Sequence, residues 1–127
     1  MEGYSVNIKF ISKEVPAKER IKLKDTTNAI SLDEATQEND SLIISPAFYA
    51  VLEVHNEKSE DKDYSKYLIV DRGGTKYVTG SKSFITAFED IAKDMQAFAP
   101  DEEYDIEVYR RESANYKGKS FITCSLV

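Results

Sequence analysis

Two strand-like segments joined by a basic loop occupy residues 104–127, and this stretch constrains the fold more than any other. The segment 104–111, YDIEVYRR, sets Ile106 and Val108 among charged residues, which is the pattern of a strand with one buried face. The segment 119–127, KSFITCSLV, is rich in β-branched and apolar residues, as strands are. We therefore predict a β-hairpin with Ile106 and Val108 on one face and the charged residues on the other.

A single long helix is predicted over residues 82–98, KSFITAFEDIAKDMQAF. Apolar residues recur there at alternating steps of four and three, which places them on one helix face. Ser81 or Ser83 can cap its first turn, and Pro100 follows its end. A stripe this broad has to pack against a sheet. We expect its phenylalanines to be part of the core: Phe84, Phe88 and Phe98.

The N-terminal region predicts a second hairpin followed by a loop. Residues 4–11 alternate apolar and polar side chains, and residues 20–24, RIKLK, do the same with Ile21 and Leu23. Residues 25–40 then lose any period and are rich in Thr, Asn, Asp, Glu and Gln, which indicates a loop with a short helical turn at 31–36, or a mobile segment.

The middle of the chain predicts four strand-like segments. Residues 42–44 and 48–55 are strand-like, and Pro46 between them favours an edge or a bend between two strand pieces. Residues 67–71 and 75–78 flank the sequence Arg-Gly-Gly. Glycine accepts a positive φ without steric cost, so this sequence predicts a tight hairpin turn.

The order of these elements suggests a known architecture. From Phe48 onward it is three strands, one helix and two strands, which is the connectivity of the five-stranded Greek-key barrel of the oligonucleotide-binding (OB) fold. We therefore predict a mainly β protein with one helix, in which an OB-like barrel occupies residues 46–127. Residues 1–45 would add an N-terminal β-hairpin and loop. The 127 residues suit a single domain.

Composition narrows the class of protein. Hydrophobic residues make up 41% and charged residues 31%, and no apolar run approaches the ~20 residues that a membrane helix needs. The first residues lack the layout of a signal peptide, so a cytoplasmic location is expected. The one cysteine, Cys124, falls in a strand pattern and is expected to be a small buried side chain.

Charge is unevenly distributed along the chain. The net charge is -6, yet residues 64–82 carry +3, whereas residues 25–46 carry -5 and residues 83–103 carry -5. The distribution of charge matters more for polyanion binding than its sum. A positive groove on an acidic protein is therefore compatible with the sequence.

Four segments together resemble one protein family. They are VNIKF near the start, VHNEKSEDKDYSKYLIVD, KYVTGSKSF at the start of the helix, and IEVYRRESANYKGKSFITCSLV at the end. The chain resembles the small single-stranded DNA-binding proteins of phages of lactococci and related Gram-positive bacteria, which also occur on conjugative elements. The resemblance implies an OB-type barrel, a homodimer, and sequence-nonspecific binding of single-stranded DNA in phage or mobile-element replication or recombination. It makes replication or recombination proteins candidate partners and the cytoplasm of a bacterial host the expected location.

Tyrosines and cations near the predicted strands form the candidate binding site. Single-stranded DNA is held by cations on its phosphates and by aromatic rings on which bases stack. The stacking residues would come from Tyr64, Tyr67, Tyr77, Tyr109 and Tyr116, some of which must be core. The phosphate contacts would come from Lys66, Arg72, Lys76, Arg110, Arg111, Lys117 and Lys119.

Other functions fit the residues less well. The single histidine, His55, has no second histidine or cysteine pair with which to bind a metal, and no acidic pair adjoins a nucleophile motif, so we expect neither an enzyme nor a cofactor. A solvated hairpin whose cations only maintain solubility is one alternative. Another is a small acidic inhibitor that mimics DNA and docks on a host protein. Such a mimic binds a basic protein and has no affinity for free single-stranded DNA.

Overall fold

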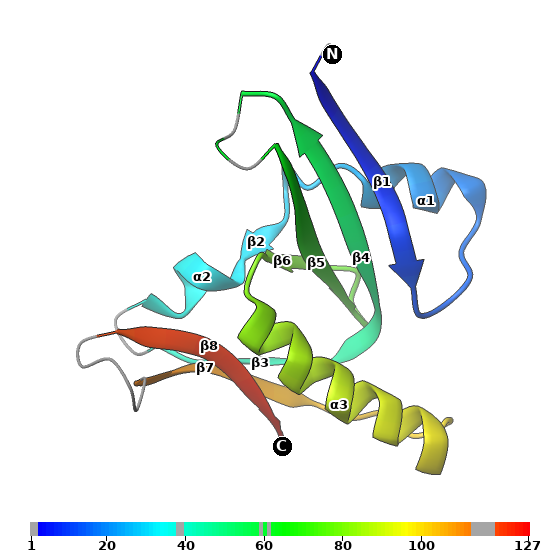
Figure 1. Ribbon diagram of the computed structural model, residues 1–127. Helices are drawn as coiled ribbons and strands as arrows, with labels where there is room; N and C mark the ends of the chain where they lie inside the picture. Colours follow the sequence, from blue (N-terminus) through cyan, green and yellow to red (C-terminus); the bar gives the residue numbers. More distant parts are fainter. Residues whose placement is uncertain (1–2, 38–39, 59, 61, 113–118) are drawn as a thin grey trace. The chain divides into compact units, whose positions relative to one another are not determined.

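The computed structural model describes residues 3–37, 40–58, 60, 62–112 and 119–127, and this part of the chain is mainly β (Figure 1). Its strands form two sheets, with the orders β1-β4-β5-β6-β2 and β3-β7-β8. The elements are β1 (Tyr4–Ile11), α1 (Ala17–Leu23), β2 (Ile30–Ser31), α2 (Leu32–Ala35), β3 (Leu42–Ile44), β4 (Pro46–Asn56), β5 (Asp63–Asp71), β6 (Lys76–Thr79), α3 (Lys82–Phe98), β7 (Ile106–Glu112) and β8 (Ser120–Leu126).

The chain divides into two compact units, and each is built from two separate segments. The first unit comprises residues 1–30 and 47–80, and the second comprises residues 31–46 and 81–127. The predicted N-terminal extension is thus divided between the units, with residues 1–30 in the first. The division into a single OB-like domain with an extension stays a prediction.

The first unit contains the predicted glycine turn. β5 and β6 pair in antiparallel fashion, and Gly74 between them has a φ of 91°. The side chain of Asp71 fixes the turn, because its Oδ1 accepts hydrogen bonds from the backbone N–H groups of Gly73 at 2.9 Å and Thr75 at 2.8 Å. The tight hairpin is confirmed, and Arg72 sits at its tip.

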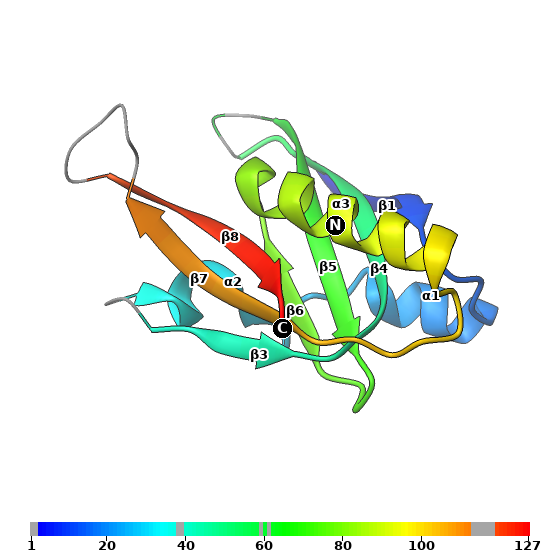
Figure 2. The same ribbon diagram turned by 90° about the horizontal axis from the view of Figure 1, so that it is seen from below.

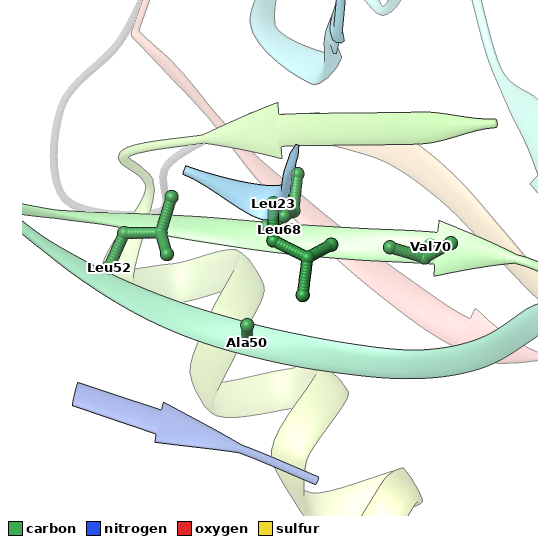
Figure 3. Close-up of a cluster of buried hydrophobic side chains, with 5 residues drawn as sticks. All are labelled: Leu23, Ala50, Leu52, Leu68 and Val70. Atoms are coloured by element: carbon green, nitrogen blue, oxygen red, sulfur yellow. The ribbon is translucent and has the colours of Figure 1, made fainter. Parts of the chain in front are cut away.

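A hydrophobic core lies between α1 and one face of the first sheet. Figure 3 shows Leu23 of α1 beside Leu68 of β5. The cluster also includes Ala50, Leu52 and Val70, and partly buried apolar residues of β1 and β4 pack against it. In Figure 1, α1 runs beside β1 and β4. Burial of these aliphatic side chains is the main stabilising term of the unit.

The prediction of an N-terminal β-hairpin was wrong, because residues 17–23 form the helix α1. Pro16 precedes the helix, and the sequence AKERIKL consists largely of strong helix formers. Two apolar residues two positions apart suit a strand, but they are about 200° apart on a helix. Leu23 accordingly is buried, whereas Ile21 is 67% exposed.

The second unit confirms the C-terminal hairpin. β7 and β8 pair in antiparallel fashion from Ile106 opposite Leu126 to Glu112 opposite Ser120, and β3 pairs with the other edge of β7 (Figure 2). Cys124 is buried as expected, and burial raises the pKa of its thiol to about 12.

The long helix α3 has the predicted bounds and packs against β8. The Ser81 hydroxyl accepts a hydrogen bond from the Phe84 N–H at 3.2 Å, which caps the first turn. Phe84 and Phe88 are buried, and their ring centroids lie 5.9 Å apart. Phe98 was expected in the core, but it is 84% exposed, because the buried residues of α3 end at Phe88 and its last turns extend beyond them.

The described chain has three helices where one was expected. α2 falls within the helical turn predicted at residues 31–36, and Ser31 caps it by accepting a hydrogen bond from the Glu34 N–H. Thr36, at the end of α2, is fully buried and donates a hydrogen bond to the Leu32 carbonyl at 2.8 Å.

We expect Leu68→Ala to lower the free energy of unfolding by about 2–5 kcal/mol, because the fully buried side chain leaves a cavity against α1. Ile21→Ala is the matched control, since it removes an exposed side chain of the same unit and should change stability by less than about 0.5 kcal/mol. Urea unfolding followed by circular dichroism measures both. Equal effects would contradict the assignment of this core.

Candidate nucleic-acid interface

The face of the second sheet that points away from its buried residues carries two aromatic rings and an arginine. Ile106, Val108 and Ile122 are buried on one face. The alternation of the strands places the other side chains on the opposite face, which we call the outer face. Its residues are Ile43, Glu107, Tyr109, Arg111, Phe121, Thr123 and Ser125.

The aromatic residues of the outer face are neighbours across β7 and β8. Tyr109 is opposite Thr123, and Arg111 is opposite Phe121, so the two rings are in diagonal positions. Phe121 is 38% exposed, and the Tyr109 hydroxyl lies 2.7 Å from the Ser125 Oγ, which orients the tyrosine ring. Rings for stacking and a cation for a phosphate are the elements of a single-strand binding surface.

In the sequence, β7 and β8 are joined by the basic loop of the predicted hairpin. The predicted site residues Tyr116 and Lys117 belong to that loop and lie outside the described residues. Lys119 immediately precedes β8 and is exposed. From the middle of β7 to the C-terminus, residues 108–127 contain four lysines and arginines and one acidic residue. This part of the sequence is therefore basic on balance.

Phe121 is a candidate site residue that the sequence analysis did not name. The signal was present, because Ile122 and Cys124 are the buried positions of β8, and alternation then turns Phe121 outward. A bulky aromatic residue on the exposed face of a strand is less expected than one in the core. Its position opposite Arg111 makes it part of the outer face.

Arg110 lies on the same face of β7 as the buried Val108. The prediction that it lies on the opposite face with the other charged residues was wrong. Its guanidinium donates to the Asp33 carbonyl at 2.8 Å and to the Ser120 Oγ at 3.3 Å. Its Nε is buried without a hydrogen-bond partner among the described residues. Arg110 thus ties α2 to the hairpin, and a structural role fits it better than a phosphate contact.

The predicted site residues of β5 and β6 are divided between the two faces of the first sheet. Tyr67 is opposite Thr79 and Tyr77 is opposite Ile69, so the two tyrosines share a face in diagonal positions. Both are partly buried. Alternation places Tyr64, Lys66 and Lys76 on the other face, which is the face that α1 covers in part.

The ammonium group of Lys76 is engaged with the end of α1. Its Nζ donates to the carbonyl of Lys22 at 2.8 Å and to the carbonyl of Asp25 at 3.3 Å. A cation at this position interacts favourably with the carbonyl end of the helix. Lys76 therefore has a structural role in the first unit.

On the opposite face, partial burial and the nearby Asp71 carboxylate raise the pKa of Tyr77, so its hydroxyl stays protonated at neutral pH.

His55 at the end of β4 lies between two carboxylates. Its Nδ1 is 2.8 Å from the Asp63 Oδ1, and its Nε2 is 3.6 Å from the Glu57 Oε1. The hydrogen bond to Asp63 is the main cause that raises the pKa of His55, and Glu57 adds to it. Protonated His55 therefore joins the two ends of the β4–β5 loop.

Charge differs strongly between the units. The first unit contains eleven basic and ten acidic residues, whereas the second contains six basic and thirteen acidic residues, giving net charges of +1 and -7. Most of the acidic residues of the second unit precede residue 108. Residues 108–127 are thus a basic segment of an acidic unit.

Comparisons with known proteins identify no relative. No family model, no curated protein and no solved structure matches this chain. Within the described ranges, no group of three or more His, Cys, Asp or Glu side chains could hold a metal ion. The described helices include none that is long and apolar enough to cross a membrane.

We expect the pKa of His55 to lie above the ordinary value of about 6.5, and Asp63→Asn to lower it. Because the pKa is raised in the folded state, the contribution of His55 to stability is present below pH ~6.5 and is lost as the pH rises through the folded pKa. The chain has one histidine, so an NMR titration of its ring resonances measures this directly. An unshifted pKa in the unmodified protein would disprove the contact with Asp63.

Proposed function

We propose that this protein binds single-stranded DNA without sequence preference and that the outer face of β7 and β8 is its base-stacking surface. The observation that carries the proposal is the diagonal placement of Tyr109 and Phe121, with Arg111 beside them. Bases of a single strand are free to stack on such rings, whereas the bases of a duplex are stacked on one another. Single strands should therefore bind more tightly than duplexes.

The pairing of the strands supports an OB-like Greek key. β4, β5 and β6 are consecutive neighbours in one sheet. α3 then provides a long connection to β7, which pairs with β3, and only Ser45 separates β3 from β4. A fourth strand that returns by a long connection to pair beside the first is the definition of a Greek key. In OB folds, single strands bind on the second and third barrel strands and on loops that correspond to the β4–β5 and β7–β8 loops.

The β5–β6 hairpin is the second element of the proposed site. In the OB reading, β5 and β6 are the second and third barrel strands, which carry the predicted residues Tyr67 and Tyr77. Arg72 at the tip of their turn adds a cation. The setting implied by the family resemblance, a homodimer acting with replication or recombination proteins on phage or mobile-element DNA in a bacterial cytoplasm, belongs to this proposal.

A DNA-mimicking inhibitor is the second candidate function. The net charge of -7 on the second unit favours it, because a dense field of carboxylates attracts a basic protein. Direct binding assays separate the two candidates. A mimic has no affinity for a single-stranded oligonucleotide even at low salt.

Fluorescence anisotropy with labelled oligo-dT and the corresponding duplex tests the proposal. We expect tight binding of the single strand that weakens with salt, and Tyr109→Ala and Phe121→Ala should each lose about 1–3 kcal/mol of binding free energy. Tyr4→Ala is the matched control, since it removes a partly exposed ring from β1 of the first unit and should leave binding unchanged. Absence of oligo-dT binding at low salt would refute the function.

The neighbouring arginines Arg110 and Arg111 should differ in effect. Arg111→Ala should reduce the slope of log affinity against log salt by about 0.7, because one phosphate contact of a single strand is lost. Arg110→Ala should leave that slope unchanged and lower the free energy of unfolding by about 1–3 kcal/mol, since it removes the hydrogen bonds to α2. The reverse assignment of the two effects would show that Arg110 contacts the DNA.

A further inference from the structure

Two of the exposed large apolar side chains lie in charged surroundings, one mainly positive and the other negative. Ile21 of α1 lies among lysines and an arginine, and Phe98 at the end of α3 lies among acidic residues. Ile21 lies on the side of α1 away from the buried Leu23, and Phe98 lies in the last turn of α3, beyond the buried residues of that helix. A single exposed apolar side chain is ordinary, but the opposite signs of the charges around these two make the two surfaces complementary.

The surface around Ile21 is basic, and we call it the α1 patch. Leu23 anchors the inner side of α1, so Ile21, about 200° away, points outward. The other members are Lys18, Arg20, Lys22 and Lys24. None of these four cations forms an ion pair with a carboxylate in the described part of the chain.

α1 is held firmly enough to present this patch. Leu23 is buried in the core of the first unit, and the Lys76 ammonium holds the carbonyls of Lys22 and Asp25. A surface that is ordered before binding loses less conformational entropy when a partner docks.

The surface around Phe98 is acidic, and we call it the α3 end. Asp94 is one helical turn before Phe98, and Asp101 and Glu102 follow the helix. All three carboxylates are exposed, and none has an ion-pair partner among the described residues.

The charges of the α3 end are unfavourable for the helix itself. The last turn of α3 contains no basic residue, and the carbonyl end of a helix is partially negative. Acidic side chains near that end are therefore repelled by the helix dipole. Cations supplied from outside would relieve this repulsion.

We propose that the α1 patch of one copy of this chain docks on the α3 end of another copy. Ile21 and Phe98 would form the apolar centre of the contact, from which water is excluded, with oppositely charged side chains around it. A second copy is the partner because the same chain carries both complementary surfaces. Each copy offers one surface of each kind, so the contact repeats and produces closed or open assemblies. The proposal does not depend on DNA binding.

Sedimentation velocity of the DNA-free protein tests this contact. The average mass should rise above the 14.4 kDa of one chain as concentration increases at low salt, and the rise should be smaller at high salt. Phe98→Ser should weaken the association about tenfold or more. Ile43→Ser is the matched control, because Ile43 is 59% exposed but lies on the outer face of the second sheet.

Charge reversal provides the decisive experiment. Lys18→Glu/Lys22→Glu reverses charges in the α1 patch, and Asp94→Lys/Glu102→Lys reverses charges in the α3 end. Each variant alone should associate much more weakly, because the first leaves the α1 patch without net charge and the second gives the α3 end a net positive charge. An equimolar mixture of the two variants should associate again, since the unaltered α3 end of the first variant meets the unaltered α1 patch of the second.

Lys58→Glu/Lys62→Glu changes the net charge by the same amount at exposed positions of the β4–β5 loop and should leave self-association intact. Circular dichroism verifies that each variant is folded. A wild-type protein that is monomeric at every concentration in low salt, association that survives both reversals, or a mixture that does not associate would each overturn the proposal.

Discussion

The missing backbone N–H of Pro46 determines how one run of chain is shared between the two sheets. Proline cannot donate to a strand ladder, so the pairing of β3 stops before it. β3 pairs with β7 in the second unit, and β4, which begins at Pro46, pairs with β1 and joins the sheet of the first unit. The Ser45 hydroxyl donates a hydrogen bond to the Asp105 carboxylate, which holds the end of β3 beside the start of β7. The division of the strands between the two sheets depends on this break.

Long periodic segments were predictable from the sequence, and short ones were not. Repeated apolar spacing predicts the bounds of α3 and the C-terminal hairpin. The glycine turn is predictable because glycine accepts a positive φ that other residues rarely adopt. Residues 20–24 contain only two apolar side chains, and their spacing suits a strand. The helix forms because the segment consists largely of strong helix formers and only Leu23 has to be buried. Phe98 continued the helical period of α3, but a period cannot reveal where the packing partner ends.

The candidate site was predictable in its chemistry more than in its geometry. Tyr109, Arg111 and the loop between the two C-terminal strands follow from residue types alone. A cation is not available for a ligand when it is hydrogen-bonded to a backbone carbonyl. Such carbonyls can be distant from the cation in the sequence, so the sequence does not reveal the contact. Lys76 is engaged with the end of α1 and Arg110 with α2, over 54 and 77 residues of sequence respectively. Phe121 was missed because an aromatic residue in an apolar strand is ordinarily assigned to the core.

The burial of the single cysteine makes this protein suitable for site-specific labelling. Cys124 is buried, and a thiol with a pKa of about 12 is almost wholly protonated at neutral pH, so it reacts poorly with alkylating reagents. A cysteine introduced on an exposed side chain would therefore be the one readily modified thiol of the protein. Pairs of such positions, one in each unit, would accept spin labels or fluorophores without removal of the natural residue. Distances between the labels would then measure the arrangement of the two units in solution.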